Sequence, residues 1–263
     1  MPTALTIAGS DSGGGAGIQA DLKTFAAHGV YGTSAITALT AQNTIGVQGV
    51  HVIPDDFVTA QIEAVVSDLG CDAVKTGMLA NSTIVEAVAA AVESLELPNL
   101  VVDPVMVAKS GDHLLDEEAV HAMRWTLIRL ARVVTPNIPE AEVLAKMSIT
   151  NAADMREAAR RIAMLKPAAV VINGGHLAGP EVIDVLLENG EYHEWIGPRI
   201  EGPNTHGTGC TFASAIAAHL AKGATLRDAV PAAKAYVEGA MRHGIALGKG
   251  HRPLDHFWNT RRA

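Results

Sequence analysis

Short runs of apolar residues alternate along the chain with longer stretches in which apolar residues recur at helical spacing. The short runs have the length and composition of buried strands and occur at 5–8, 34–40, 73–75, 100–103, 133–136 and 169–172. The longer stretches predict helices at 16–27, from Pro54 onward, and at 81–95, 151–165, 208–221 and 226–246. This alternation predicts an α/β fold with a mostly parallel central sheet and helices on both faces.

Two further apolar segments, 182–187 and 192–196, flank the dipeptide Asn189-Gly190. Asn-Gly is a favoured centre of a tight β-turn, so these segments predict a hairpin at the edge of the sheet. No Pro/Ser-rich linker and no internal repeat divides the chain. We therefore expect residues 1–263 to form a single domain.

The composition excludes several classes of protein. Hydrophobic residues make up 48% and charged residues 18%, a balance typical of globular proteins. The net charge of -8, with no basic run, argues against a nucleic-acid-binding face. No segment approaches the ~18 uncharged apolar residues of a membrane span, and no leader segment is evident. Two cysteines do not make a disulfide scaffold, so we expect a reducing, cytoplasmic location.

The segments with candidate chemistry follow predicted strands or precede a predicted helix. In parallel sheets, ligands bind beyond the carboxyl ends of the strands, so these segments are expected to meet in one place. They comprise residues 9–11, 42–43, 76–78, 103–104, 136–137, 173–175 and 204–210.

Gly207-Thr208-Gly209-Cys210 stands where a helix is predicted to begin. The small residues allow a tight entry, and the unpaired N–H groups of a helix start favour an anion such as a developing phosphoryl charge. The same position predicts a lowered pKa for the Cys210 thiol. The plainer interpretation, a glycine-rich helix start that packs a buried cysteine, stays open at this point.

A second glycine-rich segment, residues 8–17, lies between a strand and a helix. It is not a Walker A loop, because no Gly-Lys-Ser/Thr follows. Gly15-x-Gly17-x-x-Ala20 matches a loose dinucleotide fingerprint, but residues 39–43 lack the acid that would bind the ribose. A turn that lets a substrate approach the backbone is the better interpretation.

Two acids follow predicted strands, Asp103 and Glu140. ATP chemistry needs Mg²⁺, a hard cation that carboxylates bind, although each acid alone would more often be a helix cap or a loop acid. The amide of Gln42 can pair with the edge of a nitrogen heterocycle, while Met78 and Val105 could supply apolar walls. No His/Cys spacing suggests zinc.

These segments together closely resemble the hydroxymethylpyrimidine/phosphomethylpyrimidine kinases of thiamine biosynthesis. The resemblance runs from about residue 3 to residue 250 and rests on residues 7–24, 38–44, 75–79, 102–106, 135–140 and 204–210. It implies a ribokinase-like fold, a three-layer sandwich, and two ATP-dependent steps. The hydroxymethylpyrimidine is phosphorylated first, and its monophosphate is then converted to the diphosphate.

The resemblance also implies roles by position. Substrate-binding positions are Gln42, Asp21, Gly9, Met78 and Val105, and the Mg²⁺ ligands are Asp103 and Glu140. Gly207, Thr208, Gly209 and Cys210 would form the anion hole, with Cys210 as the candidate acceptor of the hydroxyl proton. Contacts to ATP are expected from Asn137, Asn173 and Thr208, and a homodimer is expected.

One position departs from the family. Asn173 stands where the family usually has lysine, so a charge-assisted contact to the ATP phosphates is lost. Pyridoxal kinase is the nearest alternative function, followed by a non-catalytic pyrimidine-binding protein and by a thiol-dependent acyl transferase. The segment 44–50, with Gly46 and Gly49 as hinges, is the predicted lid.

Overall fold

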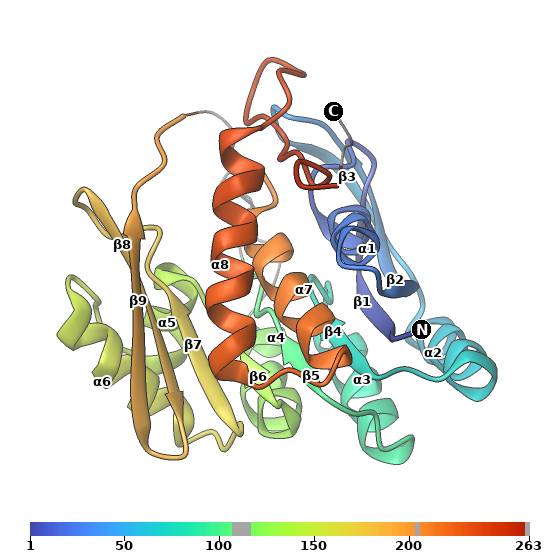
Figure 1. Ribbon diagram of the computed structural model, residues 1–263. Helices are drawn as coiled ribbons and strands as arrows, with labels where there is room; N and C mark the ends of the chain where they lie inside the picture. The colour runs from blue at the N-terminus through green and yellow to red at the C-terminus, as the bar shows by residue number, and fades with distance from the viewer. Residues whose placement is uncertain (107–116, 203–205, 261–263) are drawn as a thin grey trace.

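A computed structural model describes residues 1–106, 117–202 and 206–260. Within these residues nine strands form one sheet, in the order β3-β2-β1-β4-β5-β6-β7-β8-β9 (Figure 1). The strands are β1 Thr3–Asp11, β2 Tyr31–Gln42, β3 Val47–Val52, β4 Ala73–Thr76, β5 Leu100–Val102, β6 Val133–Val134, β7 Ala169–Asn173, β8 Glu181–Glu188 and β9 Glu191–Pro198.

Six neighbouring strands pair in parallel: β2, β1, β4, β5, β6 and β7. Strand β3 at one edge, and β8 and β9 at the other, pair antiparallel. Eight α-helices lie in the described part of the chain. They are α1 Gly17–Ala27, α2 Asp55–Leu69, α3 Ser82–Ser94, α4 Glu117–Ala122, α5 Ile138–Ala145, α6 Ala152–Ala163, α7 Thr208–Ala221 and α8 Leu226–Arg242. Short π and 3-10 turns, Met123–Leu127 and Ile128–Leu130, continue α4.

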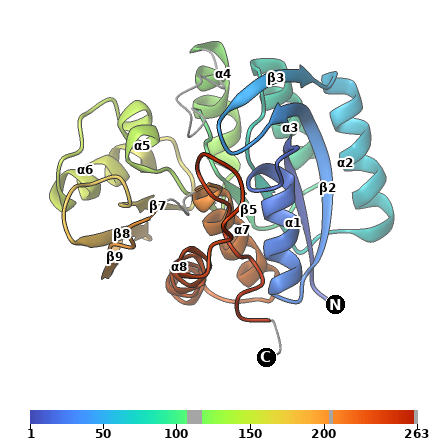
Figure 2. The ribbon, with the colours of Figure 1, turned by 90° about the horizontal axis from the view of Figure 1, so that it is seen from above.

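Two hydrophobic layers fill the space on either side of the sheet. Alternate residues of one strand point to opposite faces, so Val101 packs with α1, α7 and α8 while Leu100 and Val102 pack with α2 to α6. Figure 2 shows these two sets of helices on opposite sides of the strands. The predicted three-layer architecture, a mostly parallel sheet between two layers of helices, is thereby confirmed.

Several elements differ from the sequence-based expectation. The helix predicted over 226–246 ends at Arg242. Residues 44–50, the predicted lid, contribute to a β-hairpin that the sequence did not predict, because β3 pairs antiparallel with β2 from Ala38↔Val52 to Gln42↔Val47. This strand carries no buried residue and therefore lacks the apolar signal of the central strands. The short helix α5 was not predicted. No helix in the described ranges is long and apolar enough to cross a membrane.

Side-chain caps begin several helices. Asn81, Asn151 and Thr225 each accept a backbone N–H of the first turn of α3, α6 and α8. At α5, Asn137 and Glu140 form a reciprocal capping box. By contrast, α7 starts after Gly207, and the described residues give it no side-chain cap.

Candidate active site

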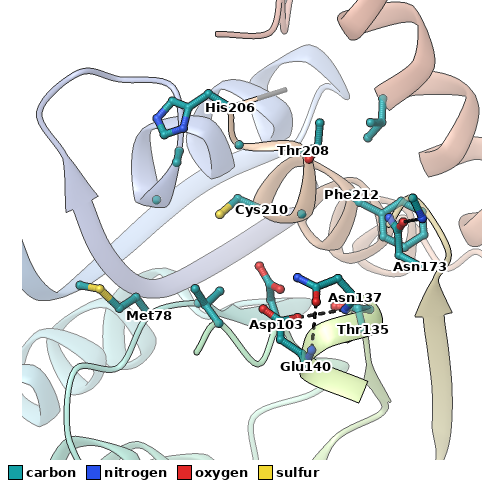
Figure 3. Close-up of a pocket in the computed structure, with 18 of the residues that line it drawn as sticks. Met78, Asp103, Thr135, Asn137, Glu140, Asn173, His206, Thr208, Cys210 and Phe212 are labelled. Carbon is teal, nitrogen blue, oxygen red and sulfur yellow. Dashed lines mark hydrogen bonds between the residues drawn. The ribbon is translucent and has the colours of Figure 1, made fainter. Parts of the chain in front are cut away.

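A cavity of about 660 Å³ opens at the carboxyl ends of the central parallel strands. Side chains from β1, β2 and the segments after β4 to β7 meet there with the start of α7 and one face of α8 (Figure 3). The predicted site residues that line it are Gly9, Gln42, Met78, Asp103, Val105, Asn137, Glu140, Asn173, Gly207, Thr208, Gly209 and Cys210. The sequence therefore predicted correctly that these distant segments converge.

Residues 207–210, the anion loop, lead into α7 with a backbone that only glycine adopts easily. Gly207 has φ of 81°, and a Cβ at this position would overlap the carbonyl oxygen of Gly15. Nothing lies within contact range of a Cβ at Gly209, so space remains above the first turn of α7. First-turn N–H groups have no partner within a helix, which suits this loop to an anion.

Cys210 does not have the lowered pKa expected from its position on α7. Burial raises the pKa of its thiol to about 12; Lys75 opposes this shift, and the negative charges of Asp103 and Asp21 reinforce it. The cysteine is therefore a protonated thiol at neutral pH. The expectation of a lowered pKa was wrong because it considered the helix end and neither the burial of the thiol nor the carboxylates that the fold brings beside it.

Asp103 and Glu140 lie together below the anion loop (Figure 3), 3% and 6% exposed. Burial raises the pKa of Asp103 to about 6, with Lys75 opposing the shift. Burial, and next the charge of Asp103, raise the pKa of Glu140 well above its usual value. Glu140 Oε2 also accepts the Asn137 N–H at 3.0 Å, so its predicted alternative role as a helix cap is real.

This carboxylate pair fits a hard cation. Asp103 Oδ2 is buried without a hydrogen-bond partner among the described residues. No group of three His, Cys, Asp or Glu side chains with metal-binding geometry occurs in the described ranges. Mg²⁺ typically takes one or two carboxylates and completes its shell with waters and phosphate oxygens, so the donor set present suits it.

A buried lysine behind the carboxylates was missed by the sequence analysis. Lys75 is 0% exposed, and its Nζ lies 3.0 Å from both Asp21 oxygens and 3.6 Å from Asp103 Oδ2. Asp21 also accepts the hydroxyls of Thr6 and Ser214, each at 2.6 Å. A charged residue inside the apolar strand β4, and an acid on the buried face of α1, were the available signals.

Asp21 consequently does not stand where the sequence analysis expected it. It is absent from the described lining of the cavity and lies behind Lys75, which is part of that lining. Its carboxylate balances the charge of a lysine that would otherwise be buried alone. Because its side chain is enclosed, Asp21 does not itself face the cavity.

The hairpin side of the cavity carries the other predicted substrate-binding residues. The Gly9 N–H donates to the Met78 carbonyl at 3.1 Å, and the Val105 N–H donates to the Asp103 carbonyl at 2.9 Å. Gln42 is held through its backbone, since its N–H donates to Ser12 Oγ and its carbonyl accepts the Ser12 hydroxyl, both at 2.8 Å. These contacts fix one wall of the cavity.

The opposite end of the cavity contains Asn173, which Figure 3 shows far from Met78. Asn173 Oδ1 accepts the Gly175 N–H at 2.9 Å and so shapes the turn after β7. Lys234 on α8, which sequence reasoning also missed, lines this end and pairs with Asp184 at 2.8 Å. Arg199 donates to the carbonyls of Gly175, Leu177 and Gly179, which ties down the following loop.

Comparisons with known proteins agree with this geometry. The sequence model of the family described as phosphomethylpyrimidine kinase matches residues 11–255. The thiamine biosynthesis bifunctional protein ThiED of Geobacter sulfurreducens is 52% identical over 96% of this chain, which spans about half (52%) of that longer protein. The hydroxymethylpyrimidine/phosphomethylpyrimidine kinase of Synechococcus elongatus is 51% identical over 98% of both chains. The solved ADP complex of Bacillus subtilis pyridoxal kinase is 42% identical, covers 97% of each chain and has a TM-score of 0.91. With its fold, its strand-end cavity and these matches along nearly its whole length, the chain belongs to the phosphomethylpyrimidine kinase family.

Proposed function

We propose that this protein transfers the γ-phosphoryl group of ATP to the hydroxymethyl group of 4-amino-5-hydroxymethyl-2-methylpyrimidine, and then phosphorylates the resulting monophosphate to the diphosphate. The observation that carries the proposal is that the anion loop, the acid pair Asp103 and Glu140, and Gln42 all line one cavity. The relatives named for this activity align with the chain over nearly its full length.

The acceptor binds on the hairpin side of the cavity. Gln42 pairs with the edge of the pyrimidine, because an amide both donates and accepts, while Met78 and Val105 cover its faces. The acceptor hydroxyl then points toward the anion loop. Its oxygen attacks the γ-phosphorus, the bond to the β,γ-bridging oxygen breaks to release ADP, and the hydroxyl proton leaves to solvent.

ATP binds across the remainder of the cavity. Asp103 and Glu140 hold Mg²⁺, which neutralises phosphate charge when bound. Asn137, Asn173 and Thr208 contact the nucleotide through polar groups. The apolar side chains of Val182, Val237 and Met241 provide a surface for the adenine ring.

Charge stabilisation by the anion loop is the main catalytic contribution. The backbone N–H groups of residues 207–210 receive the charge that develops on the transferred phosphoryl group. The transition state of phosphoryl transfer is loose, so positioning contributes more than a base does. A thiol with a pKa of about 12 stays protonated at neutral pH and is a poor acceptor of the hydroxyl proton. Cys210 therefore contributes to the shape of the anion loop rather than acting as a base. The same protonation makes a thiol-dependent acyl transferase a weaker alternative.

Pyridoxal kinase is the second candidate activity, since a solved pyridoxal kinase matches the chain at 42% identity. The test is a substrate panel with ATP and Mg²⁺, in which ADP and the mono- and diphosphate products are followed together. We expect stoichiometric ADP and pyrimidine diphosphate. Preferential turnover of pyridoxal would overturn the pyrimidine assignment, and binding without ADP release would identify a non-catalytic protein.

We further propose a homodimer of single-domain subunits in the cytoplasm. One sheet runs through the described chain, and both cysteines are free, as a reducing compartment predicts. Exposed apolar side chains occur on both faces of the β2–β3 hairpin and at the start of α2: Leu39, Ile45, Val50, Val52 and Phe57. Such patches commonly mark subunit contacts. Sedimentation of wild type and Val50→Lys tests this, and a wild-type monomer at micromolar concentration would refute it.

A further inference from the structure

We propose that Asp11 and His206 are positioning residues that couple the acceptor wall at Gln42 to the anion loop 207–210. Their side chains join at His206 Nε2 and Asp11 Oδ2, 2.9 Å apart, across 195 residues of sequence. Both residues line the cavity, and the sequence analysis gave neither of them a role of its own. Its effect on turnover rests on the proposed function, whereas its effect on the loops does not.

Asp11 organises the glycine-rich loop 11–17. It is 2% exposed, and its carboxylate accepts the N–H groups of Gly13 at 2.8 Å, Gly15 at 3.0 Å and Ala16 at 2.9 Å. His206 is the fourth donor. Burial raises the pKa of Asp11, but the interactions with His206 and the hydrogen bonds from the N–H groups of Gly13 and Ala16 together leave the pKa below its usual value. An ionised carboxylate therefore holds the loop in one shape.

His206 connects the glycine-rich loop 11–17 to the anion loop. The residue is 9% exposed, and its ring lies against Gly15, where a Cβ would overlap it. The next residue, Gly207, meets the carbonyl of Gly15 so closely that a Cβ would not fit. The two loops are thus in backbone contact, and the hydrogen bond between Asp11 and His206 fixes their relative position.

The acceptor wall is attached to the same loop. Ser12, the neighbour of Asp11, exchanges two hydrogen bonds with the backbone of Gln42. A second connection runs through the C-terminal segment, because the His251 N–H donates to the Thr44 carbonyl at 2.9 Å and the His206 N–H donates to the Arg252 carbonyl at 3.2 Å. Gln42 and Gly207 are therefore joined by two short routes that meet at His206.

The contact between Asp11 and His206 should therefore affect phosphoryl transfer and not the binding of the acceptor. The Gln42 side chain remains available when His206 is removed, so acceptor affinity should change little. The anion loop would lose its fixed distance to the acceptor oxygen, and a displacement of about 1 Å can cost on the order of 100-fold in rate. A loss of turnover with little change in KM is the signature of this role.

The experiment compares His206→Leu, His206→Gln and Tyr236→Phe. Leucine removes the hydrogen bond, and the glutamine amide can replace Nε2 as the donor to Asp11. Tyr236→Phe is the matched control, since it removes another buried hydrogen bond, from Tyr236 to the His256 carbonyl at 2.6 Å, at a residue outside the cavity lining. Turnover with ATP, acceptor KM, melting temperature and amide hydrogen exchange are measured for each.

We expect His206→Leu to lower kcat by roughly 10–100-fold with a nearly unchanged acceptor KM, and His206→Gln to restore most of the loss. Amides 13, 15 and 16 should exchange faster in His206→Leu and as in wild type in Tyr236→Phe. Equal kcat per folded protein in His206→Leu and the control, or unchanged exchange at these amides, would overturn the coupling. Absence of turnover in wild type would instead refute the proposed kinase activity, and the exchange measurement would still decide the coupling.

Discussion

Replacing Lys75 with methionine tests how the buried charges of the site are balanced. Methionine is close in volume to lysine and suits the apolar strand β4, so the change removes the charge with little loss of packing. Asp21, which is 0% exposed, would then keep the Thr6 and Ser214 hydroxyls but lose its cation. Asp103, 3.6 Å from Lys75, would lose its nearest positive charge as well.

The expected cost follows from these contacts. Breaking a buried ion pair from one side leaves an uncompensated charge and destabilises a protein by about 3–5 kcal/mol. Lys75 is enclosed and contacts both oxygens of Asp21 at 3.0 Å, so we expect a value within this range. Adding Asp21→Asn removes the orphaned charge while the amide can still bond the two hydroxyls, and it should recover most of the lost stability.

Urea unfolding of wild type, both single variants and the double variant gives the coupling free energy as a double-mutant cycle. We expect each single variant to be less stable than the double variant. A loss below about 1 kcal/mol for Lys75→Met, the usual range for exposed pairs, would refute the idea that this lysine is held by a buried counterion.

The remaining predictions concern the metal, the thiol, the nucleotide end and acid stability. Asp103→Asn should raise the Mg²⁺ concentration that half-maximal turnover requires. The protein should stay folded, because the change neutralises a buried acid, and an unchanged Mg²⁺ titration would contradict the role of Asp103. Alkylation of Cys210 by iodoacetamide should be slow at pH 8 and still rise toward pH 10, since burial raises the thiol pKa to about 12; a plateau below pH 8 would mean a thiolate. Asn173→Lys should tighten ADP binding in calorimetry, and an unchanged or lower affinity would show that the neighbouring Lys234–Asp184 pair has rebuilt this end of the cavity. Burial lowers the pKa of His219 to about 4, so the unfolded chain binds the extra proton between about pH 6.5 and pH 4. Stability should therefore fall as the pH decreases through this window, and His219→Gln should flatten the fall in acid unfolding curves.

The pattern of apolar and polar residues along the chain was sufficient to predict the architecture of the fold. The apolar runs and helical spacing predicted the order of the central elements, because alternation of short strands and longer helices fits a mostly parallel sheet. The rule that ligands bind beyond the strand ends then placed Gln42, Asp103, Asn173 and Gly207 in one region. The edge strand β3 and the short helix α5 escaped, since β3 buries nothing and α5 spans only Ile138–Ala145.

The chemistry of the site depended on partners that no local pattern reveals. Lys75 and Asp21 are 54 residues apart, and Asp11 and His206 are 195 apart. A pKa is set by burial and by charges a few ångströms away, so the Cys210 thiol could not be read from its place at a helix start. From its sequence alone this protein could be assigned its sheet, its strand-end site and its family resemblance, all of which follow from neighbours along the chain. Only the tertiary structure decided which charges are compensated, which thiol is protonated and which loops are held together, because those properties arise from residues that meet across the fold.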